Sequence, residues 1–176
     1  MDISKMKPDC TLKYIIVGNQ AVGKTSIIYR FTENKFNPQC EATVNLEFSN
    51  KNVKVIISRG YYKHVVCALV VYDITKRESF NNVSNWMKEW RNIGLSTISL
   101  VLVGNKIDLE NERQVSHEEG EEFAKKNNML FFETSALSGK NIDLLFNHSV
   151  EAIEAKIENG YNKDKDCGIE FNKQNN

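Results

Sequence analysis

The stretch that decides the fold reads Gly18-Asn19-Gln20-Ala21-Val22-Gly23-Lys24-Thr25. It fits the pattern G-x-x-x-x-G-K-[ST], in which glycines let the backbone bend so that successive amides point at phosphate oxygens. An apolar run at residues 14–17 precedes it, and Ile27, Ile28 and Phe31 follow it at helical spacing. This order of strand, loop and helix is the context that the pattern requires, so the sequence predicts a phosphate-binding loop.

Each part of this loop has an expected task. Lys24 is expected to reach the β- and γ-phosphates, and the Thr25 hydroxyl to ligate Mg²⁺. The positive end of the following helix adds to the attraction. The alternative is a glycine-rich turn with a lysine in solvent, which the flanking strand and helix disfavour. The predicted phosphate-binding residues are Gly18, Asn19, Gln20, Ala21, Val22, Gly23, Lys24, Thr25 and Ser26.

Further apolar runs lie at residues 53–57, 67–72, 100–103 and 129–132. Runs that are apolar on both faces are typical of parallel strands buried between helices. Helical spacing appears in two intervening segments, at Phe80, Val83, Met87 and Trp90 and again at Ile142, Leu145, Phe146, Val150, Ile153 and Ile157. Ser116 and Glu119 form a capping box for a helix running to about Asn127. The predicted fold is α/β, of the P-loop NTPase type, with a doubly wound, mostly parallel sheet and helices on both faces.

The length of 176 residues suits a single domain. We expect a polar arm over residues 1–11, the domain over residues 12–158, and a polar tail without fixed structure over residues 159–176. The 23 basic and 23 acidic residues balance, which disfavours nucleic acid as a partner. The four cysteines lack metal-site spacing and the longest apolar run, residues 65–71, is too short to cross a bilayer. We therefore expect a cytoplasmic monomer with reduced thiols.

A second polar stretch, Asn105-Lys106-Ile107-Asp108, follows the apolar run at residues 100–103, and Glu133-Thr134-Ser135-Ala136 follows the run at 129–132. Both should emerge at the same sheet edge as the phosphate-binding loop. A carboxylate at Asp108 can accept hydrogen bonds from the guanine N1–H and exocyclic amine, a pattern that adenine lacks, and would otherwise remain a buried, unpaired charge. Asn105, Lys106 and Asp108 are thus candidate base-binding residues; an ordinary polar turn is the alternative.

These motifs resemble the Ras superfamily, and more closely its Rab branch. The Rab-like features are Tyr72-Asp73-Ile74-Thr75, Ser79-Phe80 and Trp86, and residues 13–48 with the tail pieces 156–160 and 168–170 resemble Rabs of early secretory and recycling membranes. The resemblance implies GTP or GDP with Mg²⁺, and Rab effectors and exchange factors as partners. It further implies that Phe36 packs against guanine, that Thr43 closes over Mg²⁺ and the γ-phosphate, and that Ser135, Ala136 and Leu137 contact the base.

The chain departs from that family after the run at residues 53–57. The family carries D-x-x-G followed by Gln there, whereas this chain reads Ser58-Arg59-Gly60 and then Tyr61-Tyr62, which match the end of the family's second helix. A smaller gap lies between Phe48 and Asn50. Residues 58–66 are fewer than the roughly ten to twelve that a parallel crossover takes. We expect the second strand, the third strand and the switch II region to be shortened or irregular, with residues 44–66 strained, mobile or repaired differently.

The missing Gln would orient the attacking water in the family, so no catalytic residue is identified and hydrolysis should be very slow. The resemblance also places Gln20 near the γ-phosphate, where it would crowd that space. In the segment that effectors touch, Asn45 replaces the glycine of the family's T-I-G-V-E-F. The family's paired terminal cysteines are absent and only Cys167 lies nearby, so we expect no autonomous membrane anchor.

Four functions follow. The first is a Rab-like guanine-nucleotide switch in vesicle traffic with impaired hydrolysis. The second is a guanine-nucleotide-binding module or decoy without catalysis, and the third is a mis-spliced or mispredicted product of a normal Rab. The fourth, a P-loop phosphotransferase, would need an acceptor site and a catalytic carboxylate that the sequence does not offer, and Asp108 argues against it.

Overall fold

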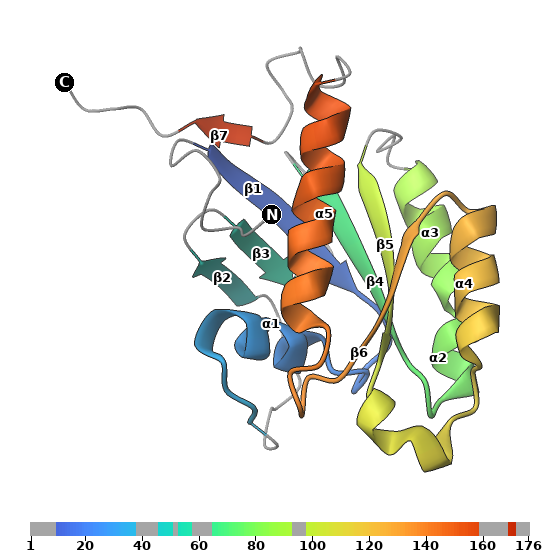
Figure 1. Cartoon of the computed structure of the whole chain (residues 1–176). Coiled ribbons are helices and arrows are strands. Elements are labelled where there is room, and N and C mark those ends of the chain that lie inside the picture. The colour runs from blue at the N-terminus through green and yellow to red at the C-terminus, as the bar shows by residue number, and fades with distance from the viewer. Residues whose placement is uncertain are drawn as a thin grey trace.

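The computed structural model describes residues 10–37, 46–50, 53–57, 65–92, 98–158 and 169–171. Strands and helices alternate along most of the chain (Figure 1). The elements are β1 (Cys10–Val17), α1 (Lys24–Glu33), β2 (Leu46–Asn50), β3 (Val53–Ile57), β4 (Cys67–Asp73), α2 (Arg77–Asn81), α3 (Val83–Asn92), β5 (Ser99–Asn105), the 3₁₀ helix η2 (Ile107–Glu112), α4 (His117–Lys126), β6 (Leu130–Thr134), α5 (Ile142–Glu158) and β7 (Ile169–Phe171).

One sheet runs through the molecule in the order β2-β3-β1-β4-β5-β6, and β7 pairs with β1. The strands β3, β1, β4, β5 and β6 are parallel, whereas β2 pairs antiparallel with β3 and β7 antiparallel with β1. The predicted mostly parallel α/β fold is confirmed. Because β1, β4, β5 and β6 point the same way, the loops that follow them meet at one edge of the sheet, at the lower end of the molecule in Figure 1.

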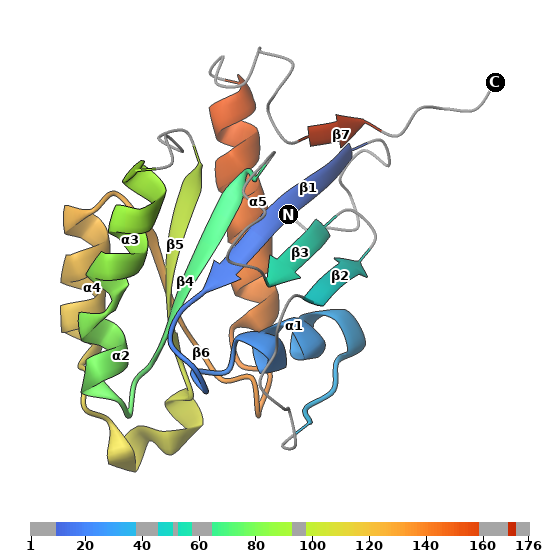
Figure 2. The ribbon, with the colours of Figure 1, turned by 180° about the vertical axis from the view of Figure 1, so that it is seen from behind.

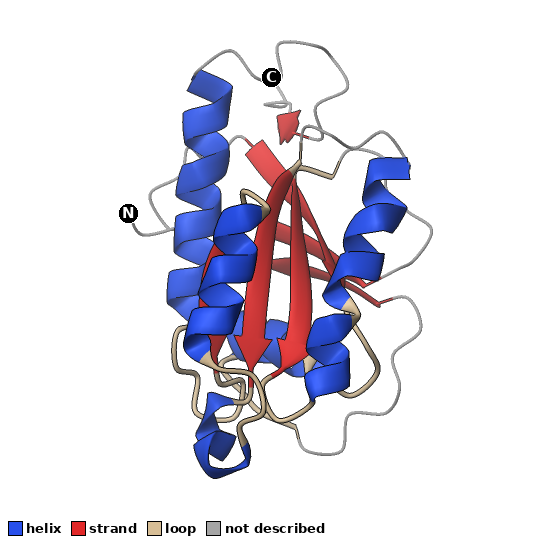
Figure 3. Ribbon diagram, turned by 90° about the vertical axis from the view of Figure 1, so that its right-hand side faces the viewer, coloured by secondary structure: helices blue, strands red, loops and turns tan. Residues whose placement is uncertain are grey.

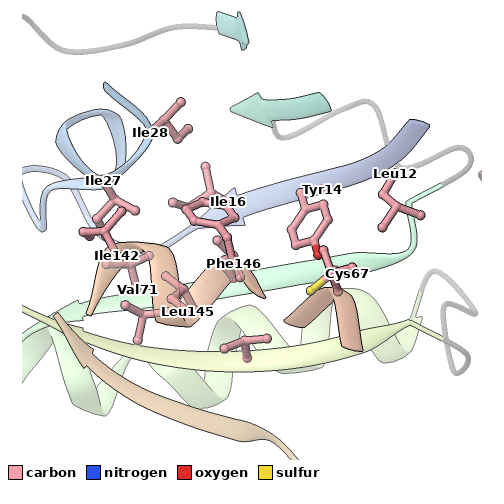
Figure 4. Close-up of a cluster of buried hydrophobic side chains, with 14 of the residues drawn as sticks. Leu12, Tyr14, Ile16, Ile27, Ile28, Cys67, Val71, Ile142, Leu145 and Phe146 are labelled. Carbon is pink, nitrogen blue, oxygen red and sulfur yellow. The ribbon is translucent and has the colours of Figure 1, made fainter. Parts of the chain in front are cut away.

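Helices cover both faces of this sheet (Figure 3). Alternate residues of β1 serve the two faces: Tyr14 and Ile16 join the core cluster that includes Ile27 of α1 and Phe146 of α5. Ile15 joins the opposite cluster, built with residues of α2, α3 and α4. Figure 4 shows the first cluster and Figure 2 the sheet from its other side. Burial on both faces explains why these strands read as apolar runs rather than as alternating ones.

The predicted helix after Ser116 is confirmed with its capping box. The Ser116 hydroxyl accepts from the Glu119 amide at 3.2 Å, and the Glu119 carboxylate accepts from the Ser116 amide at 3.1 Å. The helix ends at Lys126 with Asn127 as its C-cap, close to the expected end. The spacing from Phe80 to Trp90, by contrast, spans two helices, because the chain breaks at Asn82 between α2 and α3.

The two strands expected to be short have five residues each, against eight in β1 and seven in β4. Within that length they are regular, since all five residues of β2 pair with β3, from Leu46↔Ile57 to Asn50↔Val53. β3 and β4 lie on opposite sides of β1, so residues 58–66 carry the chain across it. Residues 44–45, 51–52 and 58–64 lie outside the described residues, and the expected strain there stays a prediction.

The tail differs from expectation at three residues, because Ile169–Phe171 form β7 against the start of β1. The last helix, α5, ends at Glu158. Within the described parts of the chain, no helix is both long and apolar enough to cross a membrane.

Candidate functional site

The loop of residues 18–23 leads from β1 into α1 with an unusual backbone. Gly18 has φ +142°, Ala21 +62° and Gly23 +96°. A Cβ atom added at Gly18 would lie 2.1 Å from the Val71 carbonyl oxygen, and one at Gly23 would lie 2.2 Å from Nδ2 of Asn105. Both positions therefore need glycine, and left-handed residues interspersed in a turn form the concave array of amides that suits an anion.

The start of α1 adds positive character to this loop. The Lys24 ammonium donates to the carbonyl oxygens of Gly18 at 3.0 Å and Asn19 at 2.6 Å, which holds its charge over the loop. The first turn of α1 contains no acidic residue, and its N-cap Gly23 supplies no side-chain cap. The helix dipole therefore meets no compensating carboxylate within that turn, and the arrangement fits a phosphate group.

A contact that the sequence analysis missed joins this loop to α3. The indole Nε1–H of Trp86 donates to the Asn19 side-chain oxygen at 3.4 Å. The sequence analysis named Trp86 only as a feature shared with the Rab branch, and no local pattern pairs it with Asn19. The phosphate-binding loop is thus held from α3 as well as from its own lysine.

Asn105, at the end of β5, ties the separate loops together. Its side chain is 1% exposed, and Nδ2 donates to the Val22 carbonyl at 2.9 Å. Its Oδ1 accepts from the Thr134 hydroxyl at 3.2 Å and from the Ala136 amide at 3.3 Å. One buried amide therefore connects the phosphate-binding loop with both residues 105–108 and residues 134–136.

The next residue, Lys106, has φ +71° and extends to the end of β4. Its Nζ lies 2.7 Å from Oδ2 of Asp73, whose side chain is fully buried. The other carboxylate oxygen of Asp73 accepts from the amide of Thr75 at 2.9 Å and from its hydroxyl at 2.7 Å. The contact with Lys106 is an ion pair rather than a well-aligned hydrogen bond, and it fixes the stem of Lys106 across the sheet edge.

Asp108 lies in η2, where its side chain is exposed. Its Oδ1 accepts from the Ser135 hydroxyl at 2.5 Å, and Ser135 Oγ accepts in turn from the Ser138 amide at 3.0 Å. The carboxylate is on the surface because η2 buries none of its residues.

Arg30 of α1 is a second contact that the sequence analysis missed. Its Nε donates to the Ala136 carbonyl at 2.9 Å and its Nη2 to the Leu137 carbonyl at 2.6 Å. Leu137 is 50% exposed, so its backbone is held while its side chain stays open to solvent. The partners lie more than a hundred residues apart in sequence, and spacing along α1 carries no signal for them.

Of the two remaining predicted residues, Phe36 and Thr43, the structure describes only the first. Phe36 is half-buried and packs against the core cluster on the α1 and α5 face. Thr43 lies outside the described residues. The structure thus brings together the loop of residues 18–25 with Asn105, Lys106, Asp108, Ser135 and Ala136 at one sheet edge.

The described residues include no group of three or more His, Cys, Asp or Glu side chains able to hold a metal ion. Mg²⁺ is commonly held by one or two protein ligands together with phosphate oxygens and water. The Thr25 hydroxyl, in the first turn of α1, could supply one such ligand.

The fold and this edge define a P-loop nucleotide-binding domain. The sequence matches the Ras family over residues 13–59 and 55–155. Ras-related protein Rab-2B of Dictyostelium discoideum is 39% identical over 165 residues, which cover 83% of this chain and 82% of the relative. Ras-related protein Rab-4 of the same organism is 36% identical over 175 residues, covering 88% and 84%. The chain belongs to the Ras family, and these relatives place it among the Rab small GTPases, which implies guanine-nucleotide binding.

Proposed function

We propose that this protein is a Rab-like guanine-nucleotide switch of vesicle traffic whose hydrolysis step is impaired. The observation that carries the proposal is the Asn105 side chain, which joins the phosphate-binding loop to the two loops expected to hold the base. A molecule with a phosphate tail and a purine at opposite ends fits that arrangement. We further propose a cytoplasmic monomer that works with Rab effectors and exchange factors.

The loop amides of residues 18–26 and the Lys24 ammonium would bind the phosphates. Thr25, joined by Thr43, would hold Mg²⁺, which neutralises phosphate charge when it is bound. Asp108 would accept the two guanine donors, with Ser135 fixing its orientation through their 2.5 Å contact. Lys106, Ala136, Leu137 and Phe36 would line the base.

Slow hydrolysis is proposed because the sequence contains no D-x-x-G motif, and Ser58-Arg59-Gly60 follow β3 in its place. Water attacks the γ-phosphate slowly when no side chain orients it. GTP hydrolysis by small GTPases is slow even with such a side chain when no activating protein assists. The same observation favours a second candidate, a guanine-nucleotide-binding module that does not switch at all.

Two measurements on one sample separate these candidates. Fluorescent GDP and GTP titrations give the two affinities, and a single-turnover assay follows phosphate release. A preference between the nucleotides with slow turnover supports the switch, whereas equal affinities without turnover support the module. Turnover as fast as that of an ordinary Rab rejects the proposed impairment, and no binding of either nucleotide rejects both candidates.

The base assignment has its own test in Asp108→Asn. An amide donates where the carboxylate accepts, so preference should move from guanine to xanthine nucleotides, with GDP affinity falling at least about a hundredfold. Glu112→Gln removes a negative charge from the same helix η2 and should leave the preference unchanged. Retained guanine preference in Asp108→Asn would remove Asp108 from the site.

A further inference from the structure

One edge of β1 is shared between two strands. β4 pairs with β1 from Tyr14↔Cys67 onward, and the Val66 amide extends this pairing by donating to the Lys13 carbonyl at 2.9 Å. On its other edge β1 pairs with β3 over Leu12 to Ile15. On the β4 side, residues 10–12 of β1 therefore extend beyond the parallel pairing. We call this segment of edge the overhang of β1.

The tail strand β7 fills this overhang. Its register is Cys10↔Phe171, Thr11↔Glu170 and Leu12↔Ile169, so its first residue lies opposite the neighbour of Lys13, whose carbonyl accepts from Val66. Leu12 already pairs with Val53 of β3, so β7 must use the edge that faces β4. Figures 1 and 2 both show β7 beside the start of β1, at the opposite end of that strand from the phosphate-binding loop.

The direction in which the backbone amides and carbonyls of β1 point shows which pairs with β7 are hydrogen-bonded. Amide and carbonyl of one residue face the same edge, and those of the next residue face the other, so Thr11 faces the same edge as Lys13. Thr11↔Glu170 is then the hydrogen-bonded pair, and Cys10↔Phe171 is a non-hydrogen-bonded pair, with Cα atoms about 4.5 Å apart in an ordinary antiparallel ladder.

A strand of three residues binds weakly by itself, but this one is tethered. Residues 159–168 join it to α5, and a short tether gives an effective concentration on the order of millimolar. An unpaired strand edge that is not covered in this way accepts extended segments from other chains. The tether therefore favours pairing of this edge with the chain's own tail over pairing with a weakly binding segment of another chain.

We infer that the β4-side edge of residues 10–12 is a strand-docking surface, and that its occupant is the chain's own tail strand, Ile169–Phe171, bound in cis. Any partner that adds a strand to β1 must displace this segment. The tail is thereby bound at the end of β1 that lies opposite the nucleotide edge. The binding free energy of such a partner must exceed the free energy of releasing the tail.

A single substitution tests the register in the full chain. Phe171→Cys places a thiol opposite the native Cys10, within the Cα distance of about 4.4–6.8 Å that a disulfide spans. Glu170→Cys is the matched control, because adjacent residues of a strand point to opposite faces. Both are made with Cys40→Ser and Cys167→Ser, oxidised at several protein concentrations, and mapped by mass spectrometry.

The expected result is an intramolecular link between positions 10 and 171, formed in at least about tenfold higher yield than in the Glu170→Cys control and independent of concentration. No such link, or equal yields in the two variants, overturns the inference. A link found between two chains, rising with concentration, also overturns it, because a second copy would then supply the strand.

Amide exchange in the full chain gives a readout that does not depend on cysteine chemistry. Glu170→Pro removes the amide that faces Thr11, and the Thr11 amide should then exchange at least about tenfold faster. Glu170→Ala keeps that amide and should exchange like the unaltered protein. Equal Thr11 exchange in the proline and alanine variants would contradict docking of the tail.

Discussion

The two halves of the nucleotide edge are built from different parts of the chain. The phosphate half depends mainly on its backbone: two glycines admit no Cβ, and the side chain of Lys24 bonds to the carbonyls of that loop. The base half is made of side chains, among them Asn105, Asp108 and Arg30. Substitutions that enlarge a residue should therefore damage the phosphate half most, and substitutions that shorten a side chain should damage the base half most.

The largest effect is expected from an added atom. Gly18→Ala would put a methyl group 2.1 Å from the Val71 carbonyl oxygen at φ +142°, so it should lower the free energy of unfolding by at least about 3 kcal/mol and abolish nucleotide binding. Gly139→Ala is the control: its φ is +83°, but its nearest neighbour, Cδ of Arg30, lies 3.4 Å away. It should cost about 1 kcal/mol in urea unfolding. Equal costs would show that strain, not contact, governs both sites.

The next effect comes from removing a buried side chain. Asn105→Ala leaves the Val22 carbonyl, the Thr134 hydroxyl and the Ala136 amide without this partner, and should lower the free energy of unfolding by about 2–4 kcal/mol. Urea unfolding and GDP titration measure its effect on stability and on affinity. Asn127→Ala removes a single bond, to the Phe123 carbonyl, and should cost about 1 kcal/mol without changing affinity. An unchanged GDP affinity in Asn105→Ala would show that nucleotide binding does not depend on the link between the two halves.

A smaller change should affect the base half alone. Arg30→Lys loses the fork that holds the Ala136 and Leu137 carbonyls, and should raise the GDP dissociation rate several-fold at a cost of about 1 kcal/mol in stability. Stopped-flow release of a fluorescent GDP measures this rate. Arg77→Lys gives up a fork to Glu119 and is expected to leave the rate unchanged. If both variants release GDP equally fast, the fork of Arg30 has no specific role.

The smallest expected effect is on an exposed ion pair outside the site. It shows how much a surface contact contributes to stability, for comparison with the contacts of the site. The Arg77 guanidinium lowers the pKa of Glu119 from 4.5 to about 2, with help from the Ser116 amide. A depressed folded-state pKa stabilises the protein above the unfolded pKa, and this stabilisation is lost as pH falls from about 4.5 through about 2. Glu119→Gln should therefore unfold at a slightly lower temperature than the unaltered protein at pH 7, and the difference should shrink at pH 3. A difference that grows on acidification would contradict the ion pair.

Local patterns were sufficient for much of the fold. The apolar runs located β1, β3, β4, β5 and β6, and the Ser116 capping box located the start of α4, because each depends on neighbours in sequence. The phosphate-binding loop was predictable for the same reason. The break at Asn82 was not, since the apolar spacing continues across it.

What the sequence did not reveal depends on distant partners. Trp86 with Asn19, Arg30 with Ala136 and Lys106 with Asp73 are each joined only after the strands have been ordered in the sheet. The exposure of Asp108 likewise follows from how η2 packs and not from its own neighbours. β7 was missed because three residues in a polar tail carry no periodic signal, and their pairing is decided by the overhang of β1.

The Asn105 amide, with one group on Val22 and the other on Thr134 and Ala136, has a consequence for how ligand fragments should bind. Pyrophosphate that rigidifies residues 18–23 would also restrain the purine side, so a nucleoside should bind more tightly in its presence. By reciprocity, guanosine should raise the affinity for pyrophosphate by the same factor.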